Sequence, residues 1–488
     1  MWYCLRLILV FIIVHCYTSA NSMQFFPLQN YSQNVDLYLN PQDPNYNLNL
    51  LSDNYQQQRL IELKHTYFGT KGSDNSPWSR DYVQYTLKQQ IGENNIASML
   101  GSYLDKFDNN SEKSANLLIY GVNNKIYPNQ WLNNVRDNID FKQITHLSYS
   151  SANRAIVCEN LYLRGLPTSR PAYYSSQIAG EGYPFDYLQL SAVYAGTPVY
   201  ILSASIDKQW LLVMSPEYIG WVKASGVARV DSDFINKWQG AAYADLAGIL
   251  HSETIIKNVD GKELFRGYVG MIFPVKHKTK GMIEVLLPER QANGMAKILL
   301  GQLSLAQAAI LPVKATPANF ALLFKTLQGR PYGWGNLDFN NDCSGEMKAI
   351  FTMFGYFMPR NAKNQNLAGK SIDITALSPA KRLEYLIENG KPLLTLVYIK
   401  GHILLYVGTY KNQDGTEFAL SYQQKWGIVP KDGKSRVIVN KAVFLPLLTS
   451  YPENNDLLTE ADSKIFQLIY LDVFPNKPLK QSLTQFLD

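Results

Sequence analysis

The chain has 488 residues, of which 46% are hydrophobic and 18% are charged. This composition supplies apolar side chains for several cores and excludes disorder along the whole length, and the length predicts about three folded units. Lys and Arg total 46 against 40 Asp and Glu, and no basic block concentrates the net charge of +6. A nucleic-acid binder that neutralises phosphates is therefore not expected. Four cysteines and six widely spaced histidines predict no metal site, and we expect no cofactor.

The first twenty residues have the pattern of a secretory signal peptide. A basic residue precedes an apolar run over residues 7–14, and small residues follow at 18–20. The run is too short for a transmembrane helix, which needs about 20 apolar residues, and we expect no membrane span elsewhere. Cleavage near Ala20 would give a periplasmic or secreted protein. A lipid anchor on Cys16 is the alternative, which the preceding residue disfavours.

The segment after the signal peptide is expected to be irregular and then helical. Residues 21–58 are rich in Asn and Gln with scattered Pro, which predicts a lead-in that wraps a later domain. Residues 52–65 and 82–107 carry Leu and Ile at three- and four-residue spacings, which indicates amphipathic helices. We expect residues 21–150 to form a mainly helical N-terminal domain.

The middle of the chain predicts two small β-barrels. Short segments rich in β-branched and aromatic residues alternate there with Gly, Pro, Asp and Ser. These segments are residues 155–161, 197–203, 210–214, 218–222, 264–275 and 282–287. Their spacing predicts one barrel over residues 151–228 and a second over residues 229–315, with a helical insert at 234–249.

The last unit, residues 316–488, is expected to be an α+β domain because its helices precede its strands. The expected helices span residues 320–327 and 344–355, and the expected strands span residues 393–399, 402–410 and 416–423.

A cysteine and a histidine in this unit predict nucleophilic chemistry. Without the signal peptide only Cys158 and Cys343 remain, and Cys343 stands at the expected start of a helix, where free N–H groups and the helix dipole lower the pKa of a thiol. His402 begins a strand, and a thiolate beside an imidazole makes a nucleophile and its general base. The alternatives are a structural histidine and a Cys343 that is buried and inert or bonded to Cys158.

A third member of the site follows from the expected hairpin. A turn centred near Gln413 places residues whose numbers sum to about 826 opposite each other, so His402 should face Gln423 or Gln424. An amide oxygen there could accept the proton on the far imidazole nitrogen and fix the tautomer. Asp342, beside the nucleophile, is a weaker alternative.

Ordered motifs in the last unit resemble those of NlpC/P60 cysteine peptidases. They are GRPYGWG (329–335), DCSG (342–345), PRN (359–361), GHILLYVG (401–408) and WG (426–427). The first barrel also resembles the first bacterial SH3 (SH3b) domain of the multidomain branch of that family. The similar segments are LRGLPT (163–168), Phe185 and Asp186 with Gln189 and Ser191, and GWV (220–222). The order of that branch is a helical stabilising domain, two SH3b domains and a papain-like peptidase domain.

The resemblance implies an exported peptidoglycan hydrolase. It would cleave the bond from γ-D-glutamate to the diamino acid, meso-diaminopimelate or L-Lys, in murein tri- or tetrapeptide stems with a free N-terminal L-Ala. Cys343 would be the nucleophile and His402 the base. We expect a monomer. The alternatives are a wall-binding SH3b scaffold with a weak or inactive peptidase domain, and a CHAP-like amidase that cuts between sugar and peptide.

The resemblance also implies substrate-binding residues and shows two departures from the family pattern. Asp342 and Ser344 would bind the amine and backbone of L-Ala, and Tyr332 would line the pocket. Gln423 stands where the family usually has His, and a polar amide is an accepted variant. Asn361 and the following Ala replace the usual Asp-Ser, which removes a charge and a hydroxyl from the stem-peptide contacts.

Overall fold

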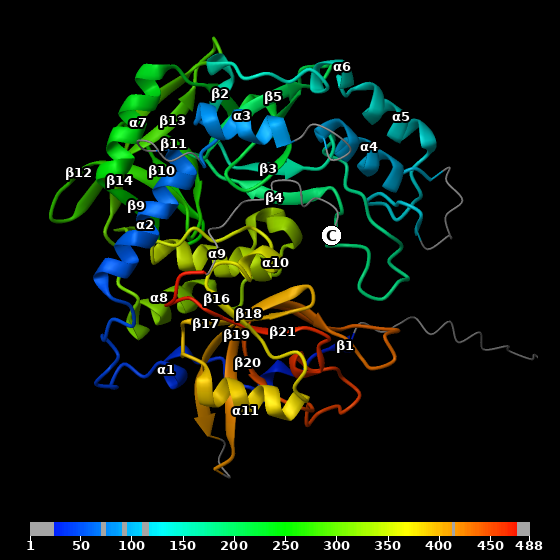
Figure 1. Cartoon of the computed structure of the whole chain (residues 1–488), viewed down its shortest axis with the longest axis vertical. Coiled ribbons are helices and arrows are strands. Elements are labelled where there is room, and N and C mark those ends of the chain that lie inside the picture. Colours follow the sequence, from blue (N-terminus) through cyan, green and yellow to red (C-terminus); the bar gives the residue numbers. More distant parts are fainter. Residues whose placement is uncertain (1–23, 70–74, 90–94, 110–116, 412–414, 476–488) are drawn as a thin grey trace, which may run out of the picture.

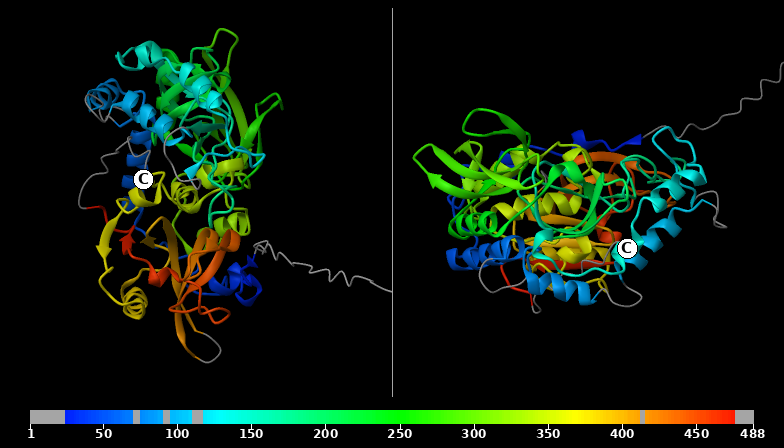
Figure 2. Two further views of the ribbon diagram at one scale, coloured as in Figure 1. Left: turned by 90° about the vertical axis from the view of Figure 1, so that its right-hand side faces the viewer. Right: turned by 90° about the horizontal axis from the view of Figure 1, so that it is seen from above.

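The computed structural model describes residues 24–69, 75–89, 95–109, 117–411 and 415–475. The predicted signal peptide lies outside these residues. The chain is multidomain, with a helical N-terminal segment, two small β-barrels and a C-terminal α+β unit. In Figure 1 the barrels occupy the upper half of the molecule and the α+β unit the lower half, and Figure 2 shows the same two layers from the side. None of the helices in the described ranges has the length and hydropathy needed to span a bilayer.

The lead-in lies along the last unit, as the sequence predicted. Strand β1 (Gln24–Phe25) pairs in parallel with β20 (Val437–Leu447) at the edge of the C-terminal sheet. Further along, the side chain of Gln33 mimics a strand: its Nε2 donates to the backbone oxygen of Phe444 at 2.8 Å, and its Oε1 accepts from the Phe444 N–H at 2.9 Å. The lead-in therefore extends the sheet by hydrogen bonds rather than by a core of its own.

The N-terminal helices serve two different units. They are α1 (Val35–Tyr38), α2 (Asp53–Phe68), α3 (Arg80–Gln89), α4 (Ile96–Lys106), α5 (Asn129–Asp137) and α6 (Phe141–Ile144). Helix α2 is capped by Ser52 and reaches the last unit, where Arg59 donates to the backbone oxygen of Ala368 at 2.7 Å. Helices α4 to α6 instead share a core with the first barrel, in which Tyr103 and Trp131 belong to the same buried cluster as Trp221.

The first barrel is a seven-stranded sheet in the order β4-β3-β7-β6-β5-β2-β8. Its strands are β2 (Arg154–Val157), β3 (Leu161–Arg164), β4 (Gln189–Val193), β5 (Pro198–Ala204), β6 (Trp210–Met214), β7 (Ile219–Lys223) and β8 (Val227–Arg229). A long loop over residues 165–188 joins β3 to β4. Asp186 holds this loop, because it pairs with Arg164 at 2.5 Å and accepts the Ala172 and Leu188 N–H groups at 2.9 Å.

The second barrel contains one correction to the sequence-based expectation. Helix α7 (Ser232–Ala244) ends before residue 249, and β9 (Leu246–Ile249) is a fully buried strand between β12 and β15. Pairing on both edges outweighs the helical pattern that continues past Ala244. The other strands are β10 (Thr254–Lys257), β11 (Glu263–Gly267), β12 (Ile272–Lys278), β13 (Met282–Arg290), β14 (Ala296–Ser304) and β15 (Ala308–Ile310).

The last unit packs helices on a seven-stranded sheet in the order β1-β20-β19-β18-β17-β21-β16. Its helices are α8 (Pro317–Leu327), η5 (Trp334–Phe339), α9 (Cys343–Met353), α10 (Ala362–Gln365), α11 (Pro379–Asn389) and η6 (Glu460–Asp462). Its remaining strands are β16 (Lys370–Asp373), β17 (Thr395–Ile399), β18 (His402–Lys411), β19 (Glu417–Ile428) and β21 (Phe466–Tyr470). Helix α9 packs on β18 and β19, and in Figure 1 it lies between this sheet and strands β3 and β4 of the first barrel.

Candidate active site

Cys343 is the first residue of α9 and lies against the start of β18. Asp342 caps the helix, since its Oδ1 accepts the Gly345 N–H at 2.8 Å. The thiol is only 7% exposed, and it accepts a hydrogen bond from the backbone N–H of Ile403. Because His402 directly precedes Ile403, the fold brings the predicted nucleophile and base to one place. Both Cys343 and Cys158 are free thiols.

The thiol is held in its neutral form, which differs from the sequence-based expectation. Burial and the negative charge of Asp342 raise the pKa of Cys343 to about 12. The N–H groups of Ile403 and Ser344 and the charge of Arg360 act in the lowering direction, as expected for a helix N-terminus, but they are outweighed. A nucleophilic reaction of this thiol would therefore need a base that takes its proton.

Gln423, and not Gln424, contacts the histidine. Nε2 of His402 lies 2.8 Å from Oε1 of Gln423, which is fully buried. The side chain of Gln424 instead donates to the backbone oxygens of Arg330 and Pro331 at 3.2 and 3.3 Å. With an acceptor at Nε2, that nitrogen carries the proton of the neutral ring, and Nδ1 is left as the basic nitrogen.

The environment of His402 favours the neutral imidazole. Burial and the positive charge of Lys425 lower the pKa of His402 to about 4, against the opposing effects of Gln423 and Glu460. The ring is therefore unprotonated at neutral pH and can accept a proton. A neutral thiol and a neutral imidazole form the resting pair.

The carboxylate of Asp342 forms an ion pair with Arg360, and all of its hydrogen-bond acceptor sites are occupied. Its Oδ1 accepts from Gly345 N at 2.8 Å and from Ser344 Oγ and Arg360 Nη1 at 3.0 Å, and its Oδ2 accepts from Gly335 N at 3.1 Å and Arg360 Nη2 at 2.7 Å. A carboxylate offers about four lone-pair sites. An incoming amine would have to displace one of these donors.

The other implied binding residues lie close by, with different surroundings. Ser344 Oγ also accepts from Arg360 at 3.0 Å. Asn361 caps α10 by accepting the Asn364 N–H at 2.7 Å, and its side chain hydrogen-bonds to Tyr218 of the first barrel. Burial and the charges of Cys343 and Asp342 raise the pKa of Tyr332 well above its usual value.

Aromatic side chains of the first barrel cover the motif segments of the last unit. The ring of Phe185 lies between Trp334 and Trp426, with centroid distances of 5.1 and 4.7 Å. Tyr187 packs against Trp334 at 6.3 Å, and its hydroxyl donates to Glu181 at 2.9 Å. The β3–β4 loop therefore packs against the GRPYGWG and WG segments of the last unit. The sequence places Phe185 in a motif, but only the structure shows that it contacts both tryptophans.

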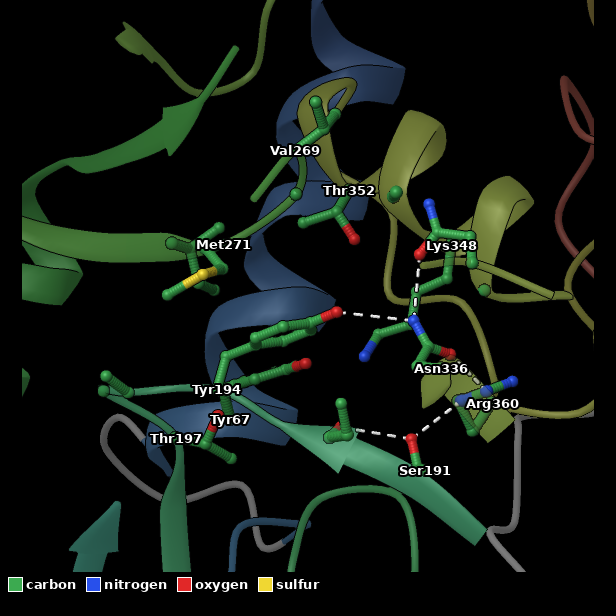
Figure 3. A pocket seen from close by; sticks show the side chains of 18 residues that line it. Tyr67, Ser191, Tyr194, Thr197, Val269, Met271, Asn336, Lys348, Thr352 and Arg360 are labelled. Carbon is green, nitrogen blue, oxygen red and sulfur yellow. Dashed lines mark hydrogen bonds between the residues drawn. The ribbon is translucent and has the colours of Figure 1, made fainter. Parts of the chain in front are cut away.

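A cavity lies beside α9, which lines it with Gly345, Lys348, Ala349 and Thr352 (Figure 3). Its volume is about 40 Å³, and both barrels and the last unit line it. Two hydrogen bonds cross it: Arg360 Nε donates to Ser191 Oγ at 2.8 Å, and Asn336 Nδ2 donates to Tyr194 Oη at 3.3 Å. These contacts join η5 and the PRN segment to the first barrel. The role of Arg360 was not predicted, although it stands in the PRN motif.

The geometry and the comparisons together define the class of this protein. An α+β unit with a buried cysteine and a half-buried histidine is packed on two small β-barrels and a helical segment. Residues 171–223 match the family model described as SH3 domain (SH3b1 type). An NlpC/P60 endopeptidase from Photobacterium damselae subsp. piscicida superposes with a TM-score of 0.76 and 27% identity, covering 91% of this chain and 98% of that one. These findings support an SH3b-containing protein of the NlpC/P60 family.

A curated relative matches over a shorter range. The γ-D-glutamyl-L-lysine dipeptidyl-peptidase of Bacillus subtilis (strain 168) is 33% identical over 122 residues, which is 24% of this chain. The match covers 39% of that relative, so the chain spans about two fifths of its length.

Proposed function

We propose that the protein is an exported peptidoglycan hydrolase. In this proposal it is a cysteine endopeptidase that cleaves the bond from γ-D-glutamate to the diamino acid of murein stem peptides. One observation carries the proposal. The thiol of Cys343, the first residue of α9, accepts a hydrogen bond from the backbone N–H of Ile403, which directly follows His402. The Bacillus subtilis relative is named for a γ-D-glutamyl-L-lysine bond, which supports this choice of bond. The pattern of residues 1–20 supports export.

The proposed reaction begins with proton transfer inside the neutral pair. Nδ1 of His402 takes the thiol proton while Sγ of Cys343 attacks the γ-carbonyl carbon of D-glutamate. Backbone N–H groups in the first turn of α9 stabilise the negative charge that forms on the carbonyl oxygen. The imidazolium then protonates the departing amine of the diamino acid. Water hydrolyses the thioester, with His402 again acting as the base.

The proposed preference for a free N-terminal L-Ala is weaker than the family resemblance implied. Binding of the L-Ala ammonium by Asp342 would require displacement of Arg360 or of a backbone donor. We therefore expect acetylation of this amine to reduce kcat/KM by about tenfold or less, corresponding to at most ~1.4 kcal/mol. The free tetrapeptide and its N-acetyl form should be compared side by side.

Mass spectrometry of muropeptide digests tests the reaction class. The proposal predicts that wild-type protein releases L-Ala-D-Glu from free stem peptides and that Cys343→Ala releases none. Separation of intact stem peptides from the glycan would instead indicate an amidase. Binding to sacculi without any cleavage product would indicate a scaffold protein.

A further inference from the structure

A buried carboxylate lies directly beneath the amide that contacts His402. Glu460 is 3% exposed and belongs to η6, far from Gln423 in the sequence. Its Oε1 accepts from Gln423 Nε2 at 3.3 Å and also from the Lys425 ammonium, and its Oε2 accepts from the Tyr451 hydroxyl at 3.1 Å. The carboxylate is ionised, because Lys425 keeps the pKa of Glu460 below its usual value.

A second acceptor faces the same nitrogen of Gln423. Ser421 Oγ lies 2.9 Å from Gln423 Nε2 and donates its own proton to the backbone oxygen of Leu445 at 2.8 Å. Since a hydroxyl has only one proton, Ser421 can act only as an acceptor toward Gln423. Both groups beneath the amide are therefore acceptors, which requires the NH₂ end of Gln423 to point down and the oxygen to point at His402.

The orientation of this amide decides which imidazole nitrogen is basic. An amide rotated by 180° has the same shape but would place its oxygen against Glu460 and Ser421 and its NH₂ against Nε2 of His402. Nε2 would then have to be the acceptor, and the ring proton would move to Nδ1. A ring protonated at Nδ1 cannot take the proton of the thiol from that side.

We propose that Glu460 is a positioning residue, which holds the His402 tautomer required for catalysis by orienting the amide of Gln423. The proposal rests on the proposed function, in which Cys343 and His402 react as a pair. Glu460 acts through Gln423 and does not touch the substrate. An amide that hydrogen-bonds to the histidine needs another group to fix its orientation, because its two ends are chemically different. A carboxylate in the same place would present an acceptor in either orientation.

The closing experiment uses the full mature chain and measures the His402 tautomer and turnover separately. The ¹⁵N shifts of labelled histidine distinguish the Nε2–H from the Nδ1–H form, with His402→Ala identifying the signal. Wild type should be in the Nε2–H form, and Glu460→Leu should populate the Nδ1–H form and lower kcat at least tenfold with KM within twofold. Tyr451→Phe removes the hydrogen bond to the other oxygen of Glu460 and is the matched control, with an unchanged tautomer.

The rescue variant distinguishes positioning from a structural role. Gln423→Glu added to Glu460→Leu moves the carboxylate next to His402, keeps a partner for Lys425 and needs no fixed orientation. We expect the Nε2–H form and most of the lost kcat to return. If Glu460→Leu does not fold, Ser421→Ala removes the other acceptor and should shift the tautomer in the same direction. An unchanged tautomer in Glu460→Leu or Ser421→Ala, or a loss of kcat that Gln423→Glu does not restore, would overturn the proposal. A wild type with the Nε2–H form that cleaves no muropeptide would contradict the proposed function alone.

Discussion

Arg360 and Asp342 form a buried ion pair at the start of α9, next to Cys343, with side chains 4% and 11% exposed and an Nη2–Oδ2 distance of 2.7 Å. Arg360 also reaches Ser191 of the first barrel, so a single guanidinium joins the cap of α9 to another domain. Removal of one partner leaves an uncompensated charge in a buried place, which is far more costly than loss of a surface pair.

The first prediction concerns this ion pair. Arg360→Met should lower the free energy of unfolding by about 3–5 kcal/mol, because the carboxylate of Asp342 stays buried without its partner. Asp342→Asn in the same chain should recover part of this loss. The exposed pair Lys381–Glu384 is the matched control, and Lys381→Met should leave the free energy of unfolding nearly unchanged. Urea unfolding checks both, and equal effects at the two sites would contradict the argument.

The second prediction concerns the reactivity of the thiol. Because the pKa of Cys343 is raised to about 12, the rate of its alkylation by iodoacetamide should rise about tenfold per pH unit from pH 6 to 10, without a plateau. Chelators should have no effect, because the proposed reaction uses the thiol of Cys343 and the imidazole of His402. Peptide mapping follows the modified cysteine. A plateau near neutral pH would show a preformed thiolate.

The third prediction concerns the acid limb of activity. The pKa of His402 is lowered from 6.5 to about 4 by burial and Lys425, while Glu460 and Asp342 act in the raising direction. His402 contributes to the free energy of unfolding above pH 6.5, where its ring is neutral in the native and the unfolded chain. This contribution is lost as the pH falls from 6.5 toward 4. The acid limb of kcat/KM should therefore lie well below pH 6, and Lys425→Met should move it upward. An acid limb at pH 6.5 in wild type would contradict the neutral resting pair.

The main elements of the site could be predicted from local sequence, but its electrostatics could not. The helix that starts at Cys343 and the strand that starts at His402 follow from hydrophobic periodicity, and both form where expected. The pKa of the thiol depends on burial by distant segments, which outweighs the helix terminus. No local pattern connects Glu460 with Gln423, because the contact exists only after β19 and η6 have packed together.

The choice between Gln423 and Gln424 illustrates the limit of the hairpin argument. Leu405 pairs with Tyr422, and a bulge between Tyr406 and Gly408 shifts the register toward the turn. The expected pairing, in which the numbers of opposite residues sum to about 826, is therefore close to the observed register but differs from it. Gln423 nevertheless reaches His402 because diagonal neighbours in a twisted sheet lie within reach of long side chains.

The fourth prediction concerns a buried carboxyl group that the proposed reaction does not use. Glu346 accepts hydrogen bonds from Tyr422 at 2.6 Å and Asn341 at 2.7 Å, and burial raises its pKa from 4.5 to about 7. The native state therefore binds this proton more tightly than the unfolded chain does. The free energy of unfolding should fall by about 3 kcal/mol from this group as the pH rises from 4.5 to 7.

Glu346→Gln checks this assignment, since an amide does not titrate. The difference in unfolding free energy between wild type and Glu346→Gln should change in the variant's favour as the pH rises through this range. Parallel pH profiles for wild type and Glu346→Gln would contradict the raised pKa.

The most direct test of the central claim uses one defined peptide, L-Ala-γ-D-Glu-meso-diaminopimelate-D-Ala, and mass spectrometry of the products. The account predicts that wild type yields L-Ala-D-Glu and diaminopimelate-D-Ala as the only products and that Cys343→Ala and His402→Ala lower the rate by several orders of magnitude. Cleavage at another bond, or a Cys343→Ala variant that forms the same products at a rate near wild type, would contradict it.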